Sequence, residues 1–177
     1  MRKVVIYIAA SANGFIAKED GDVGWLDEIP HPENEDYGYT KFYDSIDTTL
    51  MGNNTYREVL GFDVPFPYKD KKNYVFTKDE SLTKDDNVEY VSGDIAAFVK
   101  ELKSEPGKDI WLVGGGLVNS LLTNSGLVDE LILHLMPYAF GKGIPIFAAD
   151  LEDTPLLLTD SQVYSSGVVE LKYRFLS

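Results

Sequence analysis

The sequence contains no cysteine and only two histidines. The absence of cysteine excludes disulfides, thiolate metal sites and cysteine nucleophiles, and it fits the reducing cytoplasm that we expect as the location. His134 lies between Leu133 and Leu135 and is interpreted as a packed strand residue. With His31 as the only other imidazole, the chain offers too few ligands for a histidine metal site, and no metal is expected.

Cations are also scarce. The chain has 16 Lys and Arg residues against 29 Asp and Glu residues, and its net charge is −13. Nucleic acids and anionic membranes both bind basic surfaces, so neither is expected as a partner. An anionic ligand would have to be held by local donors rather than by the overall field of the protein.

The sequence also lacks long hydrophobic runs. No segment approaches the length of a membrane span, and the N-terminus has neither the length nor the cleavage pattern of a signal peptide. With 44% hydrophobic and 25% charged residues, the composition is that of a soluble globular protein. A chain of 177 residues can bury a substantial core, and residues 1–177 are expected to form one domain.

Hydrophobic patterns predict strands and helices that alternate along most of the chain. Apolar runs indicate strands at 4–10, 48–51, 73–76, 88–91, 110–113 and 127–136. Helices are expected over 33–47 and 56–60, after the capping pair Gly93-Asp94, and after the glycines at 114–116. A period of two at 169–175, preceded by the segment 156–164, predicts an antiparallel C-terminal hairpin. This order indicates an α/β domain with a mixed sheet.

The most informative motif is the glycine run that follows the predicted strand at 110–113. Gly114, Gly115 and Gly116 lead from this strand into a helix. Such a turn exposes unpaired N–H groups and the positive end of a helix dipole where no side chain intrudes, which suits a phosphate group. A tight structural turn needs fewer glycines, so three in a row favour the close approach of a ligand. No Gly-Lys-Ser/Thr follows, which excludes a P-loop.

A second turn of this kind follows the predicted strand at 48–51. Gly52, Asn53, Asn54 and Thr55 lead into the next helix, and the polar side chains can cap it or bind oxygen ligands. Two glycine-bearing turns from strand to helix favour a nucleotide ligand more strongly than either turn does alone.

An acidic residue and a long loop are further candidates for a site. Asp36 is expected on the same helix face as Tyr39 and Tyr43. It is either a first-turn acid that faces the helix dipole, which periodicity alone favours, or a proton donor whose pKa is raised by burial. The loop at 11–26 contains Trp25, which either closes over a ligand as a lid or anchors the loop.

Five stretches together carry a resemblance that covers nearly the whole chain. They are SANGFIA at 11–17, MGNNTY at 51–56, WLVGGG at 111–116, LVDEL at 127–131 and GKGIPIF at 141–147. In this order they resemble the dihydrofolate reductase-like superfamily. Within it, the chain is most similar to stand-alone bacterial proteins related to the reductase domain of the riboflavin-biosynthesis deaminase-reductase.

The resemblance implies a fold and a reaction. The implied fold is a three-layer α/β/α arrangement, in which helices cover both faces of a mixed eight-stranded sheet. The implied protein is an NADPH-dependent reductase that transfers a hydride to a small heterocycle or a sugar-derived imine, similar to 5-amino-6-(5-phosphoribosylamino)uracil reductase. The resemblance also makes the Gly114–Gly115 bond a candidate cis peptide.

The resemblance further implies roles for individual residues. The expected cofactor-binding residues are Ala9, Ile16, Gly52, Asn53, Asn54, Thr55, Thr77, Lys78, Val113, Gly114, Gly115, Gly116 and Leu117. The expected substrate-binding residues are Trp25, Tyr39, Thr40 and Tyr43. Asp36, fifteen residues before Met51, would handle the proton.

The sequence departs from the family pattern at several positions. Asn53 and Asn54 stand where NADPH-binding members usually carry a basic residue, and Lys78 could take over the contact with the 2′-phosphate. Leu133 takes the place of a threonine of the folate reductases. The segments with which riboflavin enzymes bind their phosphorylated substrate are not found. A dihydrofolate (pteridine) reductase is the nearest alternative, and a non-catalytic dinucleotide-binding protein is the alternative from another class.

The C-terminal half predicts a homodimer. The strand at 131–136 and the face formed by Val169, Leu171, Tyr173 and Phe175 offer more apolar surface than one layer of helices covers.

Overall fold

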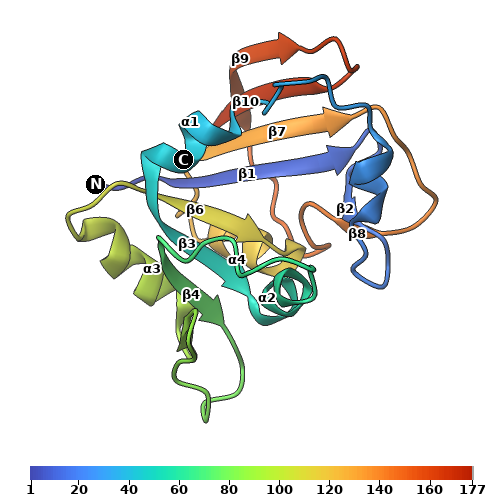
Figure 1. Cartoon of the computed structure of the whole chain (residues 1–177). Helices are drawn as coiled ribbons and strands as arrows, with labels where there is room; N and C mark the ends of the chain where they lie inside the picture. Colours follow the sequence, from blue (N-terminus) through green and yellow to red (C-terminus); the bar gives the residue numbers. More distant parts are fainter. Residues whose placement is uncertain (177) are drawn as a thin grey trace.

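The computed structural model describes residues 1–176, which form one large sheet, one small sheet and the helices that pack on them (Figure 1). The strands are β1 (Val4–Ser11), β2 (Phe15–Ala17), β3 (Ile46–Gly52), β4 (Lys72–Phe76), β5 (Glu89–Val91), β6 (Asp109–Gly114), β7 (Glu130–Met136), β8 (Ile144–Pro145), β9 (Leu156–Val163) and β10 (Val169–Phe175). The helices are the 3-10 helix η1 (Gly24–Glu28) and the α-helices α1 (Tyr39–Ser45), α2 (Asn53–Leu60), α3 (Ile95–Ser104) and α4 (Gly116–Asn124). None of these helices combines the length and the apolar character that crossing a membrane requires.

The large sheet has eight strands in the order β5-β4-β3-β6-β1-β7-β10-β9. Neighbouring strands from β5 to β7 pair in parallel, whereas β10 pairs antiparallel with both β7 and β9. The predicted mixed sheet and C-terminal hairpin are confirmed. The short strands β2 and β8 pair with each other beside the ends of β1 and β7 (Figure 1).

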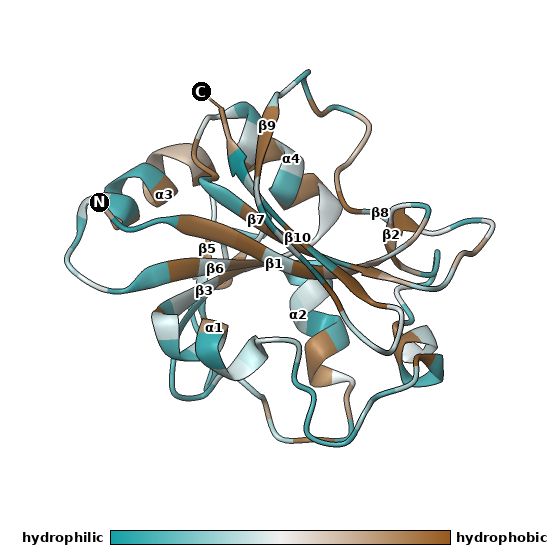
Figure 2. Cartoon of the chain, turned by 90° about the horizontal axis from the view of Figure 1, so that it is seen from above, coloured by the Kyte–Doolittle hydropathy of each residue, from teal (hydrophilic) through white to brown (hydrophobic). Residues whose placement is uncertain are grey.

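Helices cover both faces of the sheet, as expected. On one face, α3 and α4 pack through a core that includes Val99 and Leu122. On the other face, α1 and α2 pack through Phe42 and Val59. We call these the α3/α4 face and the α1/α2 face. Strand side chains alternate between the two faces, so the central strands carry the long hydrophobic runs that are visible in Figure 2.

The helix predicted over 33–47 is wrong in its first half, because α1 begins only at Tyr39. Asn34, Tyr37 and Gly38 have φ angles of 67°, 53° and 79°. Residues in this left-handed region cannot belong to a right-handed helix. The hydrophobic pattern continues through these positions, because the Tyr37 ring is buried in the core without being helical.

Two other predicted boundaries can be compared with the structure. Asp94 caps α3 as predicted, because its Oδ1 accepts a hydrogen bond of 2.9 Å from the Ala97 N–H. The strand predicted to begin at 127 begins at Glu130. Its expected first residue, Leu127, instead donates its N–H to the Leu122 carbonyl at the end of α4, over 3.0 Å.

Candidate active site

The starts of α2 and α4 lie close together at one edge of the sheet (Figure 1). Strands β3 and β6 are parallel neighbours, and Met51 pairs with Gly114 near their ends. Each strand leads directly into a helix, β3 into α2 at Asn53 and β6 into α4 at Gly116. Because parallel strands end at the same edge, the two glycine-bearing turns predicted from the sequence meet there.

Neither helix has a side-chain cap at its start. The N-cap residues are Gly52 for α2 and Gly115 for α4, and no side chain of the described residues caps either helix. Helix α3, by contrast, is capped by Asp94. The first N–H groups of a helix have no partner within the helix, so at α2 and α4 they can bind an acceptor from outside. The positive ends of two helix dipoles favour an anionic acceptor such as a phosphate group.

Close packing accounts for the glycines at these two helix starts. A Cβ atom on Gly115 would lie 3.2 Å from the hydroxyl oxygen of Thr55. A Cβ atom on Gly52 would lie 3.3 Å from the side chain of Val118. Thr55 of α2 therefore faces the start of α4 directly. The Gly114–Gly115 peptide bond is cis, as the family resemblance implied.

Gly116 has a packing role instead. A Cβ atom there would lie 2.8 Å from the carbonyl oxygen of Pro145. The Gly116 carbonyl also accepts a hydrogen bond of 3.2 Å from the Ala148 N–H. The neighbouring Leu117 is 72% exposed. Gly116 is thus covered by the segment that follows β8, whereas Gly115 is partly exposed and stands next to Thr55.

Thr77 and Lys78 follow β4, the neighbour of β3. Thr77 is buried, and its hydroxyl oxygen accepts a hydrogen bond of 3.0 Å from the Asp79 N–H. Lys78 is exposed directly after it. Because β4 runs parallel to β3, Lys78 lies at the sheet edge where α2 begins.

The loop between β1 and α1 is anchored in the core. Trp25 of η1 is fully buried, with ring centroids 5.5 Å from Tyr138 and 5.4 Å from Phe140. Of the two interpretations of Trp25, the anchor is therefore correct, and the expectation that Trp25 contacts the substrate is wrong. Ala9 packs against this cluster from β1, while Ile16 of β2 packs against the main core.

Asp36 caps the start of α1. Its carboxylate oxygens accept hydrogen bonds from the N–H groups of Gly38 at 2.9 Å and Thr40 at 3.0 Å, and the side chain is exposed. Hydrogen bonds from the Thr40 hydroxyl and from these backbone groups hold the pKa of Asp36 below its ordinary value. Of the two interpretations of Asp36, the buried acid with a raised pKa is therefore wrong, and the acid at the helix entry is correct. Its carboxyl group is ionised near neutral pH.

Aromatic rings from β1, α1 and β6 gather on the α1/α2 face. Tyr7 stacks on Phe42 with 4.4 Å between ring centroids, and Trp111 stands edge-on to both rings. Tyr39 lies 6.1 Å from Tyr7 and from Trp111, and 5.5 Å from Tyr43. Tyr39 remains 36% exposed. We call these five residues the aromatic wall.

Val113 connects the aromatic wall to the two helix starts. It lies two residues after Trp111 on β6, so both side chains point to the α1/α2 face. The next two residues are Gly114 and Gly115. The aromatic wall and the uncapped helix starts are therefore two parts of one region of the sheet.

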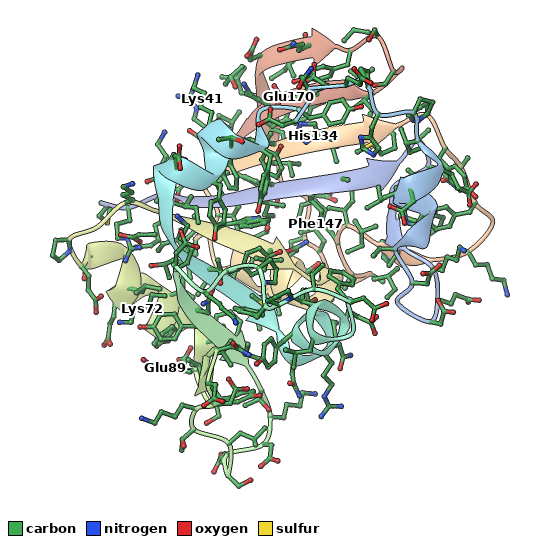
Figure 3. The ribbon with its side chains drawn as sticks, viewed as in Figure 1. Lys41, Lys72, Glu89, His134, Phe147 and Glu170 are labelled. Atoms are coloured by element: carbon green, nitrogen blue, oxygen red, sulfur yellow. The ribbon has the colours of Figure 1, made fainter. Side chains whose placement is uncertain are left out.

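His134 is buried beneath the start of α1, in agreement with its interpretation as a packed strand residue. Its Nε2 lies 3.1 Å from the carbonyl oxygen of Tyr37 and 3.1 Å from a carboxylate oxygen of Glu170. Figure 3 shows His134 and Glu170 side by side. Because both neighbours are acceptors, Nε2 carries the proton. The hydroxyl of Tyr7 donates to the same Tyr37 carbonyl over 3.0 Å.

Burial determines the charge of this His134–Glu170 pair. The two side chains are 3% and 5% exposed. Desolvation lowers the pKa of His134, although the carboxylate of Glu170 opposes this effect. His134 is therefore neutral near pH 7, and Glu170 has a second partner in Lys172, whose Nζ lies 3.1 Å from its other oxygen.

Several residues of this region were not identified from the sequence. Tyr7 precedes Ala9 by two residues on one strand, and this spacing could have placed both on one face. Leu133, which we compared with the threonine of folate reductases, packs on the α3/α4 face. The neighbouring His134 points to the α1/α2 face instead. Its contact with Glu170 depends on the register between β7 and β10, for which the sequence has no signal.

A cavity lies between the loop at 22–27 and the C-terminal end of α2. It is open to solvent, and its volume is about 450 Å³. The ionisable side chains that line it are Asp22, Asp27 and Glu58, and the apolar ones are Val23, Leu26 and Phe62.

This architecture defines a dihydrofolate reductase-like α/β protein, and solved structures share it. The chain superposes on a Shewanella sp. PV-4 protein assigned to riboflavin biosynthesis with a TM-score of 0.88 and 26% identity, covering 99% of both chains. It also superposes on dihydrofolate reductase from Enterococcus faecalis, solved with NADP(H), with a TM-score of 0.69 and 16% identity. That alignment covers 99% of this chain and 97% of the reductase.

The family follows from the sequence. The profile of the RibD C-terminal domain matches residues 2–169, so the chain belongs to this family. It is 40% identical to YwjB of Bacillus subtilis (strain 168) over 169 residues, which cover 94% of this chain and 95% of YwjB.

The capping role of Asp36 predicts a pH-dependent contribution to stability. Its folded pKa is lower than its unfolded pKa, so its charge stabilises the fold above the ordinary value near 4, and this contribution is lost as the pH falls through the lowered value. We expect Asp36→Asn to lower the melting temperature at pH 7, and the difference from wild type to shrink toward pH 3. Asp44→Asn, on the exposed side of α1, is the control. A difference that stays constant from pH 7 to pH 3 would contradict the capping role.

The His134–Glu170 pair predicts a second, separate pH window. His134 has a lower pKa in the folded than in the unfolded chain, so the unfolded chain binds more protons and stability falls as the pH drops below about 6.5. We expect His134→Asn to flatten this dependence between pH 7 and pH 5. At pH 7 it should cost about 1–3 kcal/mol, because buried Glu170 loses a donor.

Urea denaturation at pH 7, 6 and 5 measures both effects. His31→Asn is the matched control, because His31 is the other histidine of the chain and is exposed. If His31→Asn flattens the pH dependence and His134→Asn does not, the assignment to His134 is refuted.

Proposed function

We propose that this protein is an NADPH-dependent reductase that transfers a hydride to a small heterocyclic or sugar-imine substrate. The observation that carries the proposal is that two uncapped, glycine-flanked helix starts meet at the C-terminal ends of the parallel strands β3 and β6. Membership in the RibD C-terminal domain family supports a reductase. The NADP(H) complex of the Enterococcus faecalis neighbour supports the choice of cofactor.

The residues present fit the phosphate groups of such a cofactor. The N–H groups of Asn54 and Gly115, with the hydroxyl of Thr55, would hold the pyrophosphate between the two helix starts. Gly116 supports them by fixing the start of α4 against Pro145. Lys78 would bind the 2′-phosphate, since Asn53 and Asn54 provide no positive charge there.

The remaining expected residues would position the nicotinamide ring of the cofactor. NADPH, when bound, supplies the hydride. Ala9, Ile16 and Val113 would line the nicotinamide side. The aromatic wall, with Tyr39 exposed and Tyr43 half-buried along α1, would hold the substrate. Asp36 orients the start of α1 rather than donating a proton, because its carboxyl group is ionised near neutral pH.

The cofactor contacts can be tested by measuring the dissociation constant of NADPH by calorimetry. Thr55→Val keeps the shape of the side chain and removes one hydrogen bond to a charged group, so NADPH binding should weaken by about tenfold or more. Gly115→Ala should also weaken binding, because the new Cβ would lie 3.2 Å from Thr55. Thr83→Val, at an exposed position in another loop, should bind normally. Unchanged affinity in folded Thr55→Val and Gly115→Ala variants would refute this cofactor site.

We further propose that the protein is a homodimer that associates through the C-terminal hairpin. The β9–β10 register places Leu156 opposite Phe175, Leu158 opposite Tyr173 and Val163 opposite Val169. Each pair shares a face, and Leu158 and Val163 are 50% and 76% exposed. An apolar face at the end of a sheet is typical of an interface between identical subunits.

Adjacent leucines of β9 provide a matched test of the dimer. Leu157 pairs with Arg174 and points to the opposite face from Leu158, although both are exposed. We expect light scattering to report a dimer for the wild type and for Leu157→Glu, and a monomer for Leu158→Glu. A wild-type monomer at micromolar concentration would refute the proposal.

A further inference from the structure

We infer that the substrate is a planar heterocycle without a phosphate group, which binds to the aromatic wall as a neutral or positively charged ring. This inference rests on the proposed reductase function and narrows its substrate class. It follows from the Tyr39 ring, which is exposed on the α1/α2 face beside the half-buried rings of Tyr7 and Tyr43, from the nearby carboxylates and from the existing partners of the nearby lysines.

The aromatic wall is suited to a flat ligand. Tyr39 of the wall is partly exposed. The centroid of its ring lies 5.5 Å from that of Tyr43, and the two rings are stacked. Tyr7 and Trp111 present their edges to it. Exposed aromatic faces bind planar rings by stacking and attract cations through the negative potential of the ring. Neither interaction favours a phosphate group.

The charged groups around the aromatic wall are mainly acidic. Asp36 is exposed at the start of α1 and has backbone and hydroxyl donors as partners rather than a cation. Asp70 accepts a hydrogen bond from the Tyr43 hydroxyl on the other side. The carboxylates of Asp36 and Glu170 both act on Tyr7, adding to the effect of burial, which raises the pKa of its hydroxyl. A substrate phosphate would therefore be repelled from two sides.

The lysines near the aromatic wall are already engaged. Lys71 lies 4.0 Å from the centroid of the Tyr43 ring and 3.2 Å from Asp70. Lys172 lies 3.1 Å from Glu170 and 3.3 Å from Asp160. Binding a phosphate there would require breaking one of these pairs. Lys41 is exposed on the outer side of α1, away from His134 and Glu170 (Figure 3).

The cavity between the loop at 22–27 and the C-terminal end of α2 is also acidic. Its ionisable side chains, Asp22, Asp27 and Glu58, are all carboxylates. The groups suited to phosphates lie instead at the starts of α2 and α4, where no side chain within residues 1–176 caps the backbone N–H groups. The chain thus separates a phosphate-binding region from an aromatic, acidic region, and the substrate occupies the second.

The inference can be tested with pairs of ligands that share a ring and differ by one phosphate. We suggest calorimetry on the NADPH-loaded protein with riboflavin and FMN, uridine and UMP, and 5-amino-6-ribosylaminouracil with and without its 5′-phosphate. In at least one pair, we expect the unphosphorylated ligand to bind at least tenfold more tightly than the phosphorylated one. In no pair should the phosphorylated ligand bind more tightly. Tighter binding of any phosphorylated member, or no binding of any unphosphorylated ring while NADPH binds, would overturn the inference. Absence of NADPH binding would refute the proposed function instead.

Variants can identify the surface that discriminates between the phosphorylated and the unphosphorylated ligand. Tyr39→Ala should weaken binding of the unphosphorylated ring about tenfold, because the stacking contact is lost. Tyr39→Phe should bind this ring with an affinity within about twofold of wild type. Asp36→Asn should reduce the preference for the unphosphorylated ring by about two- to fivefold, because one exposed charge is removed. Asp44→Asn, on the outer side of α1, should leave the preference unchanged. Equal affinities for wild type and Tyr39→Ala would place the ring elsewhere and overturn the inference.

Discussion

The parallel pairing of β3 with β6 is the constraint on which the rest of the site depends. Parallel neighbours end at the same edge, so the helices that follow them must start side by side. Glycine at both N-cap positions then lets Thr55 and Gly115 approach closely, and in the described part of the chain no side chain caps the first N–H groups. With the proposed cofactor bound, this arrangement would let a protein with a net charge of −13 hold an anionic ligand through its backbone.

A second constraint fixes the position of the aromatic wall. The carbonyl of Tyr37, a residue with left-handed backbone geometry, accepts hydrogen bonds from both Tyr7 and His134. These two bonds join β1 and β7 to the turn that begins α1. The position of Tyr39 on the aromatic wall therefore depends on polar groups that are buried beneath it.

Local signals in the sequence predicted the parts of the fold that local chemistry determines. The glycine-bearing turns, the Asp94 cap and the buried His134 could be predicted because each depends on neighbouring residues or on strand alternation. The start of α1 could not be predicted, because Tyr37 has a left-handed backbone angle and its carbonyl is bound by side chains of the distant strands β1 and β7. For the same reason, Asp36 was expected on a helix face that begins three residues later, and the pairing of Glu170 with His134 was missed.

The uncapped helix starts affect the stability and turnover of the protein in a cell. If phosphate groups complete α2 and α4, the free protein is less stable than the bound one by an amount that grows with the logarithm of ligand concentration. Proteases act on the unfolded fraction, so a shortage of the cofactor would shorten the lifetime of the chain. The abundance of the protein would then follow the supply of the dinucleotide, in its oxidised and reduced forms alike.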